Sequence, residues 1–301
     1  MLLVLPVQTP ILGASALRRR ERAPLELWSH TLRFGCSKAV PIVALIMAGA
    51  AAVPADAAPE EIQVYMDEMD DPGHFGLDVH LNSVLDGART DDYPGEEQSR
   101  HRLRMTPEFS YGISPELEAG LYLPLTTLDA RGHFDLGGVK MRIKFIAPKT
   151  NHHNWWWGAN FEIGRVDHRL DVNPWNAELK GIIGFRSGRW TIATNGNVDF
   201  VVSGPSHTPA QQDVDTKVDF SISKRVKIGI ESYNGAGSFA HVGAFGSSDQ
   251  SMFAVADIDL GHWALNLGAG RGYGSNADRL IVKAILSVPL ERMVGRRDAA
   301  D

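Results

Sequence analysis

Two serine–histidine pairs are the features of the sequence that come nearest to a catalytic arrangement. Ser206 directly precedes His207, and Ser238 lies shortly before His241. A lipid hydrolase needs such a pair, because the imidazole takes the proton of the serine hydroxyl as it attacks an ester. Neither pair stands in a recognisable catalytic motif. The sequence therefore predicts no catalytic residue and no enzyme, and a lipid-modifying enzyme is the weakest of the alternatives.

Histidines and glycines do not provide a firmer site. His152 and His153 are adjacent, but a metal site needs further ligands, and the sequence places none near them. His80 shares its strand face with Asp78, where acid–base chemistry is conceivable, although a polar lining residue is the commoner case. Residues 270–274 (GRGYG) have glycine spacing without the strand–loop–helix context of a phosphate site and predict a hairpin loop. We expect no metal and no cofactor.

Charged residues at alternate positions are more informative than these candidates. They recur from residue 78 to residue 283, with basic and acidic side chains in neighbouring segments, and no catalytic motif accounts for them. Because strand side chains point alternately to opposite faces, these residues share one face, which must be wet or internally paired. The predicted lining comprises Asp78, His80, Arg102, Arg104, Glu108, Glu118, Tyr122, Lys140, Arg142, Lys144, Glu162, Glu178, Lys180, Asp199, Lys217, Asp219, Glu231, Asp257, Asp259, Arg279 and Lys283.

Residues 100–128 show most clearly which elements position this lining. Leu103, Met105 and Phe109 alternate with arginines and Glu108, and after a turn at residues 112–115 the alternation resumes at Leu117. Strict alternation predicts two extended strands, and the short connection predicts an antiparallel hairpin. Similar alternation follows to residue 290. It predicts about twelve strands, most of them near the 9–11 residues that cross a bilayer at a tilt.

Three observations favour a membrane barrel over a soluble sandwich or a lipocalin-like barrel. The polar faces are charged in nearly every strand, so they cannot form one dry core. Tight connections (residues 186–189, 223–225 and 261–262) alternate with long ones (residues 86–98, 203–213 and 232–250), and only residues 146–154 are longer than expected. Tryptophans lie near strand ends, as in an interfacial girdle: Trp155, Trp157, Trp175, Trp190 and Trp263. The fold class is therefore all-β, a transmembrane antiparallel up-and-down β-barrel.

The first 57 residues predict an export signal. Basic residues precede the apolar run at residues 39–52, and Ala55 and Ala57 form a small-x-small cleavage pattern. We expect residues 1–57 to be removed, although residues 1–32 have no clear role. Residues 58–73 predict a solvated, acidic periplasmic lead-in without the spacing of an EF-hand. The barrel should span residues 74–290, and residues 291–301 should form a tail.

The net charge of the chain limits the classes of partner that it can bind. The full chain of 301 residues has a formal net charge of −6, and without residues 1–57 it carries 24 Lys and Arg against 33 Asp and Glu, a net charge of −9. This balance argues against nucleic acid as a partner. The lone cysteine, Cys36, lies in the removed segment, which suits an oxidising periplasm. The expected surroundings are the lipid and lipopolysaccharide of a bacterial outer membrane.

Several segments resemble a known family. They include EIQVY near Glu61, PGHFGLDVHLN from Pro72, LRMTPEFSYGISPELEAGLYLP, GGVKMRIKF, FEIGRVDHR, WNAELKGIIGFR and ADRLIVKAILSVPL. These segments resemble the proteobacterial outer-membrane β-barrels described as putative transporters, which are loosely similar to barrels linked to phenol degradation. The resemblance covers residues 60–290 and implies the membrane and the fold, with small apolar solutes only suggested. The chain departs from that pattern in lacking a terminal aromatic residue on its last strand.

The predicted function is a pore or transporter for small solutes. An interior charged on almost every strand suits a weakly selective path, because a solute must bind loosely enough to leave. Barrel diameter grows with strand number, and about twelve strands is a number between that of filled eight-stranded barrels and that of open porins. The sequence therefore permits a narrow channel or a salt-bridged plug. A closed structural barrel is the main alternative. The acidic lead-in is expected at the periplasmic mouth, where it would form a constriction.

Overall fold

The computed structural model describes residues 61–126, 135–148, 154–239, 241–243 and 248–290. Within them every regular element is a β-strand, and there is no helix long and apolar enough to cross a membrane. The predicted signal region, His152, His153 and the predicted tail lie outside the described residues.

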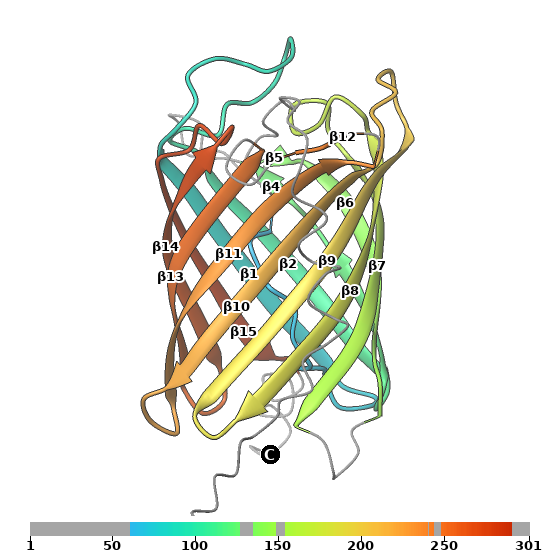
Figure 1. The fold of residues 1–301 in the computed structure, drawn as a ribbon. Helices are drawn as coiled ribbons and strands as arrows, with labels where there is room; N and C mark the ends of the chain where they lie inside the picture. The colour runs from blue at the N-terminus through green and yellow to red at the C-terminus, as the bar shows by residue number, and fades with distance from the viewer. Residues whose placement is uncertain (1–60, 127–134, 149–153, 240, 244–247, 291–301) are drawn as a thin grey trace, which may run out of the picture. The chain divides into compact units, whose positions relative to one another are not determined.

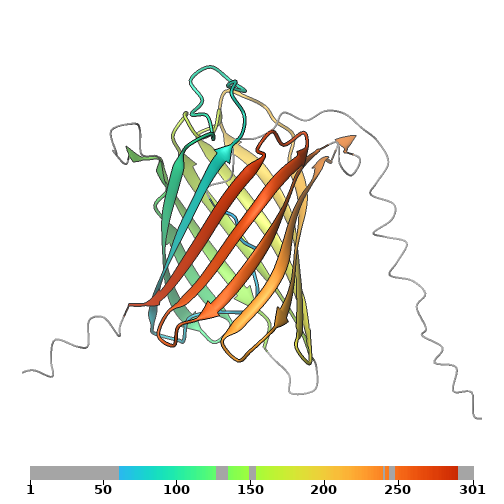
Figure 2. The ribbon, with the colours of Figure 1, turned by 90° about the vertical axis from the view of Figure 1, so that its left-hand side faces the viewer.

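The strands form one antiparallel sheet that closes on itself (Figures 1 and 2). Their bounds are β1 Phe75–Asp86, β2 Leu103–Ser114, β3 Leu117–Tyr122, β4 Leu125–Thr126, β5 Asp135–Leu136, β6 Gly138–Ile146, β7 Trp155–Val166, β8 Trp175–Ser187, β9 Trp190–Ser203, β10 Gln211–Ser221, β11 Val226–Ser238, β12 His241–Val242, β13 Asp249–Asp259, β14 Ala264–Gly274 and β15 Leu280–Pro289. The short β4 and β5 continue the lines of β3 and β6, and β12 pairs only with the end of β11. The predicted closed barrel of twelve strands is therefore confirmed.

The two ends of the barrel differ. Residues 115–116, 188–189, 222–225 and 260–263 connect strands at one end, which is the lower end in Figure 1. Residues 87–102, 167–174, 204–210 and 275–279 connect strands at the other, upper end. The first strand begins and the last strand ends at the tight-turn end, where the Leu290 amide donates to the Phe75 carbonyl at 3.0 Å. This asymmetry is the one that the sequence predicts.

The alternation places large apolar side chains on the outer surface. Phe109, Leu121, Met141 and Ile183 are all exposed on strands, although they are strongly apolar. Such a band needs an apolar surrounding rather than water. The outer face also carries the five predicted girdle tryptophans, which are all exposed: Trp155, Trp157, Trp175, Trp190 and Trp263.

Two strand ends depart from the predictions. The predicted long loop at residues 232–250 is shorter, because β11 continues to Ser238 and pairs there with β10. The predicted hairpin loop at residues 270–274 is the end of β14, where Met252 of β13 lies opposite Arg271. Both segments lack apolar alternation, which is needed only where a strand crosses lipid. They extend the barrel beyond the apolar band.

Candidate functional site

The lumen is occupied by part of the chain itself. Residues 61–71, here called the lumen segment, run through the interior before β1 begins, and are visible as the blue trace inside the barrel in Figure 1. Ile62, Val64, Tyr65 and Met66 are all buried in it. The prediction of a solvated lead-in is therefore wrong for Ile62, Val64, Tyr65, Met66 and Asp67, which are buried, whereas Glu68 and Asp71 are exposed. Of its acidic residues, Asp67 pairs with Arg186 of β8, and the Asp70 carboxylate accepts from Ser110 Oγ.

Polar side chains of the wall bind the backbone of the lumen segment. The Tyr65 amide donates to Asn195 Oδ1 at 2.6 Å, and Asn195 Nδ2 donates to the Tyr65 carbonyl at 2.9 Å. Lys283 Nζ donates to the Ile62 carbonyl at 2.8 Å, and Lys144 Nζ to that of Glu68 at 2.6 Å. These bonds satisfy backbone groups that have no strand partner, as buried peptide groups require.

Apolar patches on the inner wall receive the apolar side chains of the segment. Ile62 packs in a cluster with Phe253 and Ile281, whereas Val64 and Met66 pack with Trp156. The charged residues at alternate positions predicted a wholly polar inner face, and these apolar patches were not predicted. The sequence did contain a sign of these patches, because the alternation of β7 and β13 places Trp156 and Phe253 on the inner face. Inward apolar residues in a polar lumen indicate something apolar to cover.

One charged cluster surrounds Arg142 on β6. Its Nε donates to Glu108 at 2.5 Å, and its Nη2 lies 2.8 Å from Glu118. Glu108 also bonds His80 Nε2 at 3.0 Å. All four side chains are buried, so the guanidinium is the counter-charge that makes two buried carboxylates tolerable.

A second cluster lies on the wall formed by β10, β11, β13 and β15. Lys283 pairs with Glu231, and Lys217 Nζ lies 3.2 Å from Glu231 and 2.8 Å from Asp257. Asp219 is 3.6 Å from the same ammonium. The two clusters lie on different parts of the wall, and the lumen segment contacts both of them, through Tyr65 and Ile62 respectively.

The structure places the predicted lining residues in three groups. The buried ones are His80, Arg104, Glu108, Glu118, Tyr122, Arg142, Lys144, Glu162, Lys180, Lys217, Asp219, Glu231 and Lys283. The half-buried ones are Asp78, Arg102, Lys140, Glu178, Asp199 and Asp257. The last two, Asp259 and Arg279, are exposed at strand ends, so they do not line the lumen itself.

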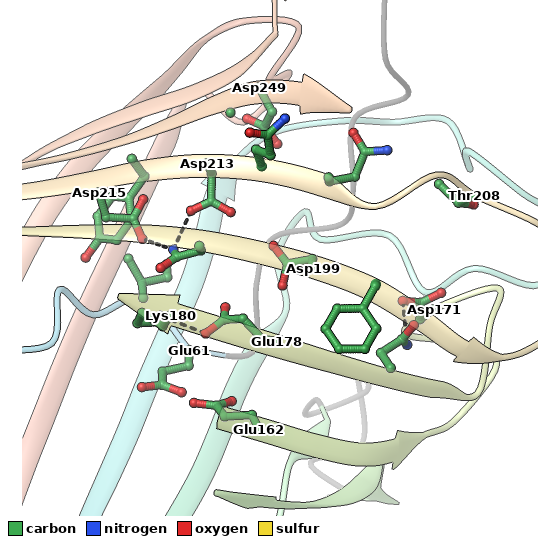
Figure 3. A pocket seen from close by; sticks show the side chains of 18 of the residues that line it. Glu61, Glu162, Asp171, Glu178, Lys180, Asp199, Thr208, Asp213, Asp215 and Asp249 are labelled. Atoms are coloured by element: carbon green, nitrogen blue, oxygen red, sulfur yellow. Dashed lines mark hydrogen bonds and ion pairs between the residues drawn. The ribbon is translucent and has the colours of Figure 1, made fainter. Parts of the chain in front are cut away.

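A cavity of about 470 Å³, here called the chamber, lies between the lumen segment and the long-loop end. Figure 3 shows that Glu178, Asp199, Asp213 and Asp215 come from adjacent strands and lie around one space. The loops contribute Asp278, whose carboxylate accepts from Ser99 Oγ at 2.9 Å. Burial raises the pKa of the Asp278 carboxyl above its ordinary value.

Comparisons with known proteins show which folds resemble this barrel. No family model matches the sequence, and no curated protein matches it significantly. Among solved structures, an outer membrane channel from Pseudomonas putida F1 is similar at 14% identity with a TM-score of 0.53, covering 76% of this chain and 99% of that chain. The KdgM porin is similar at 10% identity with a TM-score of 0.47, covering 71% and 98%. The chain has the fold of an outer-membrane β-barrel.

The serine candidates of this barrel have other partners. Ser206 Oγ lies 3.3 Å from Thr208 Oγ1, and Ser238 Oγ accepts from the backbone amide of His241 at 3.1 Å. A nucleophilic serine needs the imidazole itself as its base. The described contacts therefore do not favour a catalytic pair at either position.

One group of side chains has the composition of a metal site. The ligand atoms of Glu61, His80 and Glu108 lie within 4.8 Å of one another. The lumen segment supplies Glu61, so the sequence alone could not bring it to His80. Glu108 is already bound by Arg142 and by His80, which accounts for its charge without an ion.

Proposed function

We propose that the protein is an outer-membrane pore for small solutes, closed in the described state by the lumen segment. The observation that carries this proposal is the way in which the segment is held. It contacts the wall through side-chain hydrogen bonds and apolar packing and does not pair with the sheet as a strand. Such contacts can be released without breaking the barrel. The chamber then provides the beginning of a polar path from the long-loop end.

We also propose where in the cell the protein is located. The exposed apolar band and the tryptophan girdle suit a bilayer, and the fold is that of outer-membrane barrels. We therefore place the protein in a bacterial outer membrane, with its lipid and lipopolysaccharide as surroundings and the long loops outside. Fractionation of the membranes and heat-modifiable migration on gels test this placement. Recovery of the mature chain as a soluble periplasmic monomer would contradict it.

Removing the lumen segment should open the pore. The change is deletion of residues 58–71 from the mature chain, which leaves β1 intact. We expect rare, small conductance steps in planar bilayers with the complete mature chain and larger, sustained steps with the shortened one. Heat-modifiable migration must first show that both forms are folded. Folded protein without conductance in either form would instead support the closed structural barrel.

Asn195→Ala provides a milder test that keeps the segment. Both hydrogen bonds to the Tyr65 backbone are lost, and each is worth about 1 kcal/mol. We expect more frequent openings of unchanged size in single-channel recordings. The exposed Asn154 serves as the matched control, since Asn154→Ala removes the same groups away from the lumen. Equal opening frequencies in the two variants would argue against gating by the segment.

A further inference from the structure

The chamber has an unusual balance of charge. Among the described residues that line it, nine carry carboxylates and three carry cations. The carboxylates are Glu61, Glu162, Asp171, Glu178, Asp199, Asp213, Asp215, Asp249 and Asp278, and the cations are Arg104, Lys140 and Lys180. A concave, partly desolvated space lined by one sign of charge concentrates ions of the opposite sign.

The lysines of the chamber are already engaged. Lys180 Nζ lies 3.1 Å from Glu178 and 4.6 Å from the centre of the Tyr65 ring. Lys140 Nζ lies 3.7 Å from Glu162. These pairs leave Asp199, Asp213 and Asp215 of β9 and β10 close together, in a part of the chamber where carboxyl groups outnumber cations.

Hydrogen-bond acceptors also outnumber donors in this part of the chamber. Asn197, which is 4% exposed, donates from Nδ2 to both Asp213 and Asp215, at 2.7 Å for the latter. Its Oδ1 has no hydrogen-bond partner among the described residues, and neither has Glu61 Oε1. Buried acceptors are normally satisfied by a protein group or by ordered water, so both oxygens can accept from a molecule bound in the chamber.

The remaining lining is apolar and aromatic. Phe200, Tyr233 and Phe253 face the same cavity, together with Val166 and Val201. Aromatic faces attract organic cations, and apolar side chains cover their hydrocarbon parts. A volume of about 470 Å³ is within the range of small-molecule sites. This mixture suits an amphipathic ligand better than a hydrated inorganic ion.

We propose that the chamber binds small organic cations with ammonium or guanidinium groups, and that it makes the pore cation-selective. The N–H groups of such a ligand would donate to Asp199, Asp213 and Asp215 and to the free amide oxygen of Asn197. Binding rests on the chamber alone, whereas selectivity also rests on the proposed pore. The substrate class of the pore is then amines rather than anions.

Spermidine is a suitable probe for binding. We expect titration calorimetry with the folded mature chain to show binding that weakens at least about tenfold in the double variant Asp199→Asn, Asp213→Asn, because charged hydrogen bonds are lost. The double variant Asp91→Asn, Asp92→Asn is the matched control, since it removes the same charge from a loop outside the chamber lining. Asparagine keeps the volume and relieves like-charge crowding, so the barrel should stay folded.

Reversal potentials in a KCl gradient test the selectivity. We expect a preference for K⁺ over Cl⁻ with the parent chain and the loop variant, and a clearly smaller preference with the chamber variant. Binding of Mg²⁺ as tight as that of spermidine would overturn the organic class, and equal effects of the two double variants would overturn the site. Conductance without spermidine binding or a selectivity change rejects the inference and leaves the pore standing. Spermidine binding that depends on Asp199 and Asp213, without conductance in any form, rejects the pore and leaves the site standing.

Discussion

Replacing Arg142 by methionine is expected to lower the free energy of unfolding by about 3–5 kcal/mol. Methionine nearly preserves the volume but removes the cation that contacts both Glu108 and Glu118. Two carboxylates then remain buried at 2% and 3% exposure without their shared counter-charge. Equilibrium unfolding of the barrel in detergent or lipid vesicles, followed by tryptophan fluorescence and gel migration, measures the loss.

The same residues provide the control for this prediction. Adding Glu108→Gln and Glu118→Gln to Arg142→Met removes the uncompensated charges, so most of the lost stability should return. Arg225→Met tests the removal of an arginine from an exposed turn, where a change below about 0.5 kcal/mol is expected. If the triple variant were as unstable as the single one, packing of the guanidinium rather than its charge would be the cause.

Replacing Leu121 by arginine should cost about 2–4 kcal/mol, the cost of a cation at the bilayer midplane on a barrel surface. Leu121 is 37% exposed on β3, between Phe109 of β2 and Met141 of β6, within the apolar band. Refolding into vesicles at increasing urea concentrations measures the change. Leu286→Arg on β15 should lower the stability of the barrel by a similar amount.

Leu136 is the matched control for the lipid face. It is 56% exposed on β5 at the long-loop end, where a strand extends towards the interface. Arginine is tolerated there, so Leu136→Arg should cost about 0–1 kcal/mol. Equal costs at positions 121 and 136 would mean that the outer face does not meet a bilayer core.

Alternation was sufficient to predict the barrel from the sequence, because period-two patterning is a local property of each strand. It located the membrane-crossing strands from β1 to β15, and it assigned Leu121 to the outer face of the barrel and Arg142 to the inner face. It failed where the lipid no longer imposes the pattern, as at Ser238 on β11 and Tyr273 on β14. There the strand continues because its neighbour provides backbone partners, and no side-chain pattern reports this.

The lumen segment could not be placed in the same way. Ile62, Val64 and Met66 alternate like a strand, yet the contacts that fix them come from residues up to 221 positions later, as between Ile62 and Lys283. Such pairing depends on which wall residues the closed barrel brings inside. The chamber has the same origin, since its carboxylates come from separate strands and from the segment.

The attachment points of the lumen segment also have a mechanical consequence. Tyr65 is bound by Asn195 of β9 and by Tyr122 of β3, and the segment is bound on either side of Tyr65, at Ile62 by Lys283 of β15 and at Glu68 by Lys144 of β6. These strands are distributed around the circumference, so the segment works as a cross-brace that resists flattening of the barrel. Its departure would leave a hollow cylinder whose cross-section can fluctuate. The open pore should therefore be noisier than a rigid channel of equal width, because its bore would vary with the wall.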